Sequence, residues 1–187
     1  MVKELIIKNR SVRRYDSSKR LDRSALSELV DSARVCSNAG NRQRIRYETV
    51  CGEEGLRAVR SALGFAAYLK DWGGPDASEN PTGYIIMLAD DDDANLFIDM
   101  GIAAASMLLL ATERGLGGCI FRSFNPEKIK EALGTDKYTP RLVISLGVPS
   151  ERVELTKVRD NDVKYYREND VHMVPKLSLD DVLVIEK

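Results

Sequence analysis

The sequence is poor in the residues that enzymes use to react through their own side chains. It contains a single histidine, His172, which lies in a polar C-terminal stretch, and only three cysteines. We therefore expect neither Ser-His-Asp nor Cys-His catalysis, and we interpret His172 as an incidental surface or interface residue. No catalytic residue can be assigned, so the reactivity of an enzyme with this sequence must come from something other than its side chains.

The cysteines also lack the spacing of a metal or redox site. Cys36, Cys51 and Cys119 are far apart and odd in number, and no CxxC or Cys/His pattern flanks them. This usage favours reduced, packed thiols in a cytoplasmic protein, and we expect no metal. Four aspartates at 90–93 precede an apolar helix, and we interpret them as its N-cap and as charges that complement its dipole.

The chain has no excess of positive charge and no long hydrophobic run. Its 28 Lys and Arg balance 29 Asp and Glu, so a general affinity for nucleic acid or an anionic membrane is not expected. The N-terminus lacks the pattern of a secretory signal. The longest apolar run, 101–111, is about half of the roughly 20 residues that cross a bilayer, and Asp99 precedes it. We expect a buried helix rather than a membrane span.

Helical and strand-like patterns alternate along what we interpret as a single domain, 1–187. The patterns predict helices at 2–8, 22–38, 53–63, 95–114 and 125–133, and strands at 45–50, 84–89, 117–121 and 141–146. The helix at 95–114 is apolar almost all round, which places it at the centre of the molecule or in a subunit interface. The long loop 71–83 has the length of a lid or binding loop, and Trp72 within it is interpreted as a packing anchor.

The last part of the chain, 150–187, differs in character from the rest. Its hydrophobic residues are sparse, and no run is strong enough to form a core of its own. The apolar residues are nevertheless too many to leave in water. We therefore expect this extension to wrap a partner, most simply a second copy of the chain in a homodimer.

A basic cluster near the N-terminus, NRSVRRY at 9–15, stands out in a nearly neutral chain. Arg10, Ser11 and Arg13 are suited to a terminal phosphate, although this stretch taken alone favours a solvated basic turn. A small polar loop at 37–43 could approach a flat heterocycle closely. No GxGxxG follows a strand and no P-loop motif is present, so other nucleotide sites are weakly supported.

The blocks RSVRRY, SNAGNRQ, TERGLGG, CIFRSFNPEKIKEALG and PRLVISLGVP, in this order and spacing, resemble the FMN-dependent nitroreductase family over essentially the whole chain. The resemblance implies an α+β fold, a three-layer α/β/α sandwich with a mostly antiparallel central sheet. It also implies an intertwined homodimer with an exchanged C-terminal tail and FMN sites at the interface. The implied activity is an NAD(P)H-dependent FMN oxidoreductase, in which NADH or NADPH reduces flavin N5 and a small acceptor (nitroaromatic, quinone or enone-like) is reduced in a ping-pong cycle.

The resemblance places part of the cofactor site on the basic cluster and near the C-terminus. Arg10 and Ser11 would bind the phosphate and ribityl chain of FMN, and Lys176 would complete the phosphate site. Arg13 would lie along the cofactor, where a cation at the N1/C2 edge stabilises the reduced flavin. Arg14 is expected to face solvent or a surface partner.

The remaining implied residues lie on two other segments. Asn38, Ala39 and Asn41 would contact the isoalloxazine or ribityl of the other subunit's FMN. Arg122 and Ser123 fall where the family offers backbone N–H groups toward flavin N5 and O4.

The chain departs from the family pattern at some positions, which keeps alternatives open. The family commonly has arginine at the position of Asn9 and glycine at that of Arg122, whose side chain could point toward the flavin or outward. The same fold also supports reductive dehalogenation, ring dehydrogenation or flavin breakdown, and a non-catalytic FMN or phosphate-ligand binding protein would share these residues. The acceptor, the preference between NADH and NADPH, and the role of 71–83 do not follow from the sequence.

Overall fold

The computed structural model describes residues 1–90, 92–134 and 136–185. The helices are α1 (Val2–Lys8), α2 (Arg23–Arg34), α3 (Glu53–Ser61), α4 (Ala94–Glu113), α5 (Pro126–Leu133) and α6 (Leu179–Val182), with two 3-10 turns, η1 (Ala39–Asn41) and η2 (Ala77–Glu79). The strands are β1 (Arg46–Val50), β2 (Gly83–Ala89), β3 (Gly117–Phe121), β4 (Thr139–Gly147), β5 (Arg152–Lys157), β6 (Tyr166–Glu168) and β7 (Val171–Lys176). The expected α+β class is confirmed.

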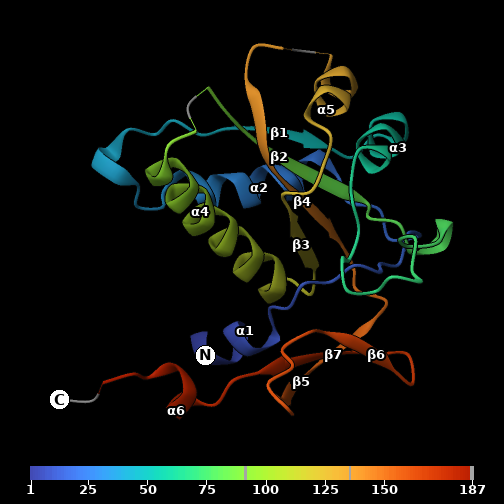
Figure 1. The fold of residues 1–187 in the computed structure, drawn as a ribbon. Coiled ribbons are helices and arrows are strands. Elements are labelled where there is room, and N and C mark those ends of the chain that lie inside the picture. The colour runs from blue at the N-terminus through green and yellow to red at the C-terminus, as the bar shows by residue number, and fades with distance from the viewer. Residues whose placement is uncertain (91, 135, 186–187) are drawn as a thin grey trace.

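The central sheet has the strand order β1-β2-β4-β3, and every neighbouring pair is antiparallel. Successive side chains of a strand point to opposite faces, and β2 is buried on both. Ile85 and Met87 pack with α2 and α4 on one face, whereas Tyr84 and Ile86 pack with α3 and α5 on the other. The result is the expected three-layer arrangement, with helices on both sides of a mostly antiparallel sheet (Figure 1).

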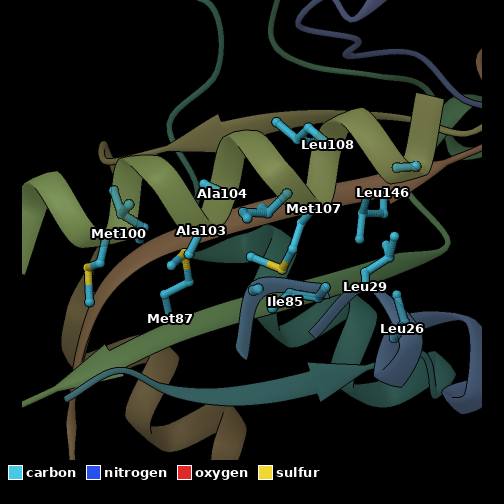
Figure 2. Packing of buried hydrophobic residues seen from close by; sticks show 14 of the residues in the cluster. Leu26, Leu29, Ile85, Met87, Met100, Ala103, Ala104, Met107, Leu108 and Leu146 are labelled. Atoms are coloured by element: carbon cyan, nitrogen blue, oxygen red, sulfur yellow. The ribbon is translucent and has the colours of Figure 1, made fainter. Parts of the chain in front are cut away.

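Helix α4 has one buried face and one exposed apolar face. Met100, Ala104 and Met107 are buried against the sheet (Figure 2), whereas Ile98 is 60% exposed and Ile102 is 37% exposed. Within the described ranges, α4 is the single helix whose length and composition would suit a membrane span. Length and composition alone are weak evidence for a span, because core helices of soluble proteins can have the same length and composition. The exposed apolar face of α4 is where a second subunit would pack, and this interface stays a prediction.

Most helix ends lie where local residue chemistry predicts them. Asp22 and Asp93 are N-caps whose carboxylates accept hydrogen bonds from backbone N–H groups, and Asn125 caps α5 in the same way. Gly134 ends α5 in the left-handed conformation, with φ 64°. The interpretation of the aspartate run as a helix cap is thus confirmed for Asp93, whereas Asp91 lies outside the described residues.

The C-terminal part of the chain corrects one prediction. Strands β5, β7 and β6 form a second, three-stranded sheet, in which β5 and β7 are parallel and β6 and β7 antiparallel. The sequence analysis predicted no strand beyond residue 149, so this sheet is a correction, whereas neither hydrophobic core cluster of the described residues includes a side chain from it. Its strands are short and mostly half-exposed, so their sequence lacks the apolar runs of the central strands.

The part of the extension that remains unpartnered is 177–185. It runs away from the central sheet (Figure 1), and its large apolar side chains are exposed. These side chains belong to Leu177, Leu179, Val182, Leu183, Val184 and Ile185. Wrapping around a partner stays a prediction, now confined to this shorter segment.

Candidate cofactor site

The basic segment 9–15 lies along the edge strand β3 of the central sheet. Ser11 forms a parallel bridge with Gly118, and the N–H of Val12 donates to the carbonyl of Gly118 at 3.0 Å. This approach needs glycine at position 117, because a Cβ there would lie 2.8 Å from Cγ2 of Val12. Gly118 has a different role, since a Cβ on it would lie 2.5 Å from Cδ2 of Leu108 on α4. Gly117 thus allows the segment to pack directly on β3, and Gly118 allows α4 to pack against that strand.

Tyr15 anchors the other end of the segment in the core. Its side chain is fully buried, and its hydroxyl donates to the carbonyl of Val12 at 2.6 Å and lies 2.7 Å from Oγ of Ser145. Burial raises the pKa of the Tyr15 phenol well above its ordinary value, so the hydroxyl remains neutral. This anchoring role of Tyr15 was not predicted from the sequence. The pattern that could have indicated it is an aromatic residue directly after a charged run.

Between this segment and the small C-terminal sheet lies a pocket of about 390 Å³. Its polar lining comes from the basic segment and from β7, and consists of Asn9, Arg10, Ser11, Arg13, His172 and Lys176. Its apolar lining comes from α4, β3, the loop before β6 and β7, and includes Ala105, Leu108 and Ile120. No Asp or Glu is among the lining residues, so no carboxylate of the lining competes with an anionic ligand for the pocket's cations.

The guanidinium of Arg10 is only partly hydrogen-bonded. Its Nη2 donates to the carbonyl of Ile6 at 2.6 Å. Its Nε is buried and has no hydrogen-bond partner in the described part of the chain. A buried donor without a partner is costly, so a ligand that accepts a hydrogen bond here would be favoured.

The guanidinium of Arg13 is held at the wall of the pocket by two rings. Its Nη1 lies 3.3 Å from Nε2 of His172, and its Cζ lies 4.9 Å from the centre of the Tyr165 ring. The backbone N–H groups of Arg13 and Arg14 both donate to the carboxylate of Glu151. Arg13 therefore has both its backbone and its side chain fixed.

Arg14 points elsewhere, as expected. It pairs with Asp170 at 2.8 Å and with Glu79 at 3.2 Å. Trp72 is a packing residue, also as expected, since its ring lies 6.1 Å from that of Phe65.

His172 corrects the sequence analysis. It was expected at the surface or in an interface, but it is 1% exposed within a single chain. Burial, and then the neighbouring guanidinium of Arg13, lower the pKa of His172 below its ordinary value of 6.5. A lone histidine in a polar stretch carries no signal of burial, because the strand that buries it pairs with distant residues.

The loop that carries Asn38, Ala39 and Asn41 lies outside the basic pocket. The N–H of Ala39 donates to Oδ1 of Asp99 at 2.8 Å, and Oδ1 of Asn38 accepts from the N–H of Gln43 at 3.0 Å. Asn41 adopts a positive φ of 51°, which asparagine tolerates. The buried carboxylate of Asp99, which the sequence analysis did not assign to a site, fixes this loop on α4. Contact with a partner's cofactor remains an expectation that one chain does not test.

Arg122 and Ser123 follow β3 and form a third group. The guanidinium of Arg122 lies over the ring of Phe97 on α4, at 4.6 Å from its centre. The carbonyl of Ser123 accepts from the N–H of Gly64 at 2.8 Å, which ties the residues after β3 to the loop after α3.

Of the nine residues that the resemblance implies, one pocket gathers Arg10, Ser11, Arg13 and Lys176. The other five lie on the two separate segments described above. Within the described ranges, no group of three or more His, Cys, Asp or Glu side chains could hold a metal ion.

Comparison with known proteins shows which family the chain resembles. The model of the nitroreductase family matches residues 6–148, which is most of the chain. A search of curated proteins finds no significant match.

Solved structures share the fold. A nitroreductase family protein from Clostridium difficile is 25% identical, with a TM-score of 0.62 and coverage of 81% of this chain and 85% of that one. A Staphylococcus epidermidis protein assigned as an NAD(P)H:FMN oxidoreductase is 18% identical, with a TM-score of 0.71 and coverage of 100% and 95%. An Exiguobacterium sibiricum protein assigned as a nitroreductase, solved in complex with FMN, is 16% identical, with a TM-score of 0.69 and coverage of 89% and 97%.

The family match over most of the chain agrees with the α+β fold and with the order of the sequence blocks. The chain belongs to the nitroreductase family.

Proposed function

We propose that the protein is an FMN-dependent oxidoreductase that transfers two electrons from NADH or NADPH to a small organic acceptor in a ping-pong cycle. The observation that carries the proposal is the pocket in which Arg10, Arg13 and Lys176 meet without an acidic residue. The complex of the Exiguobacterium relative with FMN and the name of the Staphylococcus relative support it. Nitroaromatic, quinone and enone-like compounds are the proposed acceptor classes.

The residues of the pocket fit FMN. A phosphate monoester carries about −1.5 to −2 charges at neutral pH, which the guanidinium of Arg10 and the ammonium of Lys176 would balance. The buried, unpartnered Nε of Arg10 is suited to a phosphate or ribityl oxygen. The wall formed by Leu108 and Ile120 offers apolar surface to a flat ring, and Ile120 is 42% exposed in the single chain.

The chain's own groups bind and orient, and the cofactor supplies the redox chemistry. A bound FMN would supply two-electron redox chemistry at N5 between the nicotinamide and the acceptor. Arg10, Ser11 and Lys176 would hold its phosphate end, and Arg13 would present a cation to the N1/C2 edge of its ring. The backbone N–H groups of Arg122 and Ser123 are proposed to face N5 and O4. No side chain in the pocket is assigned as an acid or base.

The active form is proposed to be a homodimer. The exposed apolar face of α4 and the segment 177–185 would be buried by a second copy. In that dimer the loop with Asn38, Ala39 and Asn41 would contact the partner's cofactor. The free cysteines support a cytoplasmic location, and the balanced charge gives no reason to propose nucleic acid or membrane as a partner.

Anaerobic stopped-flow spectroscopy of the FMN-loaded protein tests the electron donor. Mixing with NADH or NADPH should bleach the flavin absorbance, and a quinone added afterwards should restore it. Failure of both nicotinamides to bleach the flavin would remove this activity and leave the alternatives: dehalogenation, ring dehydrogenation, flavin breakdown or FMN binding without turnover.

A further inference from the structure

The buried ring of His172 has a defined protonation state in its contact with Arg13. A guanidinium only donates hydrogen bonds, so Nε2 of His172 must accept from Nη1 of Arg13 across the 3.3 Å that separates them. The ring proton then sits on Nδ1, which is buried and has no partner in the described part of the chain. The contact thus requires a neutral imidazole.

The same contact fixes where the Arg13 cation lies. The guanidinium stacks 4.9 Å from the centre of the Tyr165 ring, and the Tyr165 and His172 rings are 5.1 Å apart. The Tyr68 ring supports Tyr165 from the loop after α3, at 5.0 Å. Tyr165 and His172 together leave the Arg13 side chain little freedom, at the edge of a pocket that both also line.

We propose that His172 is a positioning residue for Arg13: its neutral ring holds the guanidinium at the cofactor pocket, and protonation of the ring releases it, so that FMN binding weakens in acid. The part that concerns FMN rests on the proposed function, whereas the coupling between the two side chains does not.

The charges around His172 help to set the pH at which its ring gains a proton. Arg13 from the basic segment and Arg167, its cross-strand neighbour on β6, both disfavour a second positive charge. Lys176 lies in the same pocket, at the end of the strand that carries His172. Glu151, just before β5, favours the charged ring, but it already accepts from Arg167 and from the backbone of Arg13. Burial and Arg13 prevail over Glu151, so the ring is neutral at pH 7 and charges only below its ordinary pKa of 6.5.

The coupling can be measured in the protein without cofactor. Because the chain has one histidine, the imidazole Hε1 gives a single NMR signal that follows the titration of His172 directly. The midpoint should lie below 6.5 in the parent protein. Arg13→Gln should raise it by about one pH unit, since a cation next to the ring is removed. Arg14→Gln, whose guanidinium pairs with Asp170 and Glu79 outside the pocket, should leave it unchanged. Equal midpoints in the parent and Arg13→Gln would overturn the proposal.

FMN titrations followed by quenching of flavin fluorescence test the consequence. The phosphate of FMN itself gains a proton near about pH 6, so the parent protein must be compared with His172→Gln, whose Oε1 can accept from Arg13 without ever becoming charged. The Kd values should agree within about threefold at about pH 8, and the parent should lose about tenfold more affinity at about pH 5. His172→Phe, which cannot accept, should bind weakly at both.

Parallel pH profiles for the parent and His172→Gln would overturn the link to FMN. Tighter binding by the parent in acid would also overturn it, because His172 would then be a cationic ligand of the phosphate. If neither protein binds FMN at any pH, the proposed function fails, and the NMR titration alone decides whether His172 positions Arg13.

Discussion

The hydroxyl of Tyr15 joins the basic segment to the core of the domain. It donates a hydrogen bond to the carbonyl of Val12, within the segment, and also lies within hydrogen-bond distance of Oγ of Ser145 on the central strand β4. Arg13 lies between Val12 and Tyr15, so the phenol helps to fix the backbone that carries this cation, whereas His172 and Tyr165 hold its side chain.

Tyr15→Phe tests this dependence. The change leaves a buried carbonyl and a buried serine hydroxyl without a partner, which should lower the free energy of unfolding by about 1–3 kcal/mol. FMN affinity should fall as well, because the segment loosens. Urea unfolding followed by circular dichroism measures the first effect, with the exposed Tyr166→Phe as the control. An unfolding midpoint equal to that of the parent would show that the hydroxyl does not anchor the segment.

Site residues that belong to a recognisable sequence motif could be predicted, whereas those whose role depends on being buried could not. Arg10, Arg13 and Lys176 were assigned because their family motifs survive in the sequence, and the fold gathers them in one pocket. His172 and Asp99 were not assigned to the site, because each owes its role to a place in the interior that distant strands and helices create.

At the scale of an element, helix α4 depends on its first residues. The carboxylate of Asp93 accepts from the N–H of Leu96 and from the guanidinium of Arg44, which lies just before β1. The hydrogen bond from Arg44 and then that from Leu96 lower the pKa of Asp93 from 3.8 to about 2. One side chain thus caps the helix and ties it to the segment that follows the polar loop.

Replacing Asp93 separates the two roles. Asp93→Ala should lower the free energy of unfolding at neutral pH, since both the cap and the ion pair with Arg44 are lost. Asp93→Asn keeps the cap, so it should lower the unfolding free energy by less. The lowered pKa means that the ionised Asp93 contributes stability above pH 3.8, which is lost as the pH falls toward about 2.

Urea unfolding at several pH values measures these effects. The difference in unfolding free energy between the parent and Asp93→Asn should disappear in acid. The difference between the parent and Asp93→Ala should become smaller. A constant gap from neutral pH to acid would contradict the ion pair with Arg44.

Helix caps were predictable because they are local, and the C-terminal sheet was not because its pairing is distant. Asp22 and Asn125 act on N–H groups within three residues of themselves. Strand β7 instead pairs with β5, from Arg152 and Val171 onward, although β6 lies between them in the sequence. Strands of three to six residues that alternate polar and apolar positions give too weak a signal to reveal such pairing.

At the scale of the molecule, the division of the C-terminal extension makes the dimer testable. Residues 152–176 pack as a sheet beside the basic segment, whereas 177–185 presents apolar side chains to solvent. If a second copy covers those side chains, removing them should weaken association without unfolding the chain.

A chain that ends at Lys176 tests this. Light scattering after gel filtration should give a dimeric mass for the full chain and a monomeric mass, or a much weaker dimer, for the shortened one. Its circular dichroism spectrum should be that of a folded α+β protein. A dimer of undiminished stability would show that 177–185 does not wrap the partner. Ending the chain at Pro149 should also remove the wall of the pocket that carries His172 and Lys176.

The visible absorption spectrum of the purified protein tests whether it binds FMN. We predict a yellow protein with a bound-flavin spectrum, which Arg10→Gln and Arg13→Gln weaken and which Arg14→Gln, at a residue outside the pocket lining, retains. A colourless protein that also fails to quench the fluorescence of added FMN would contradict this prediction.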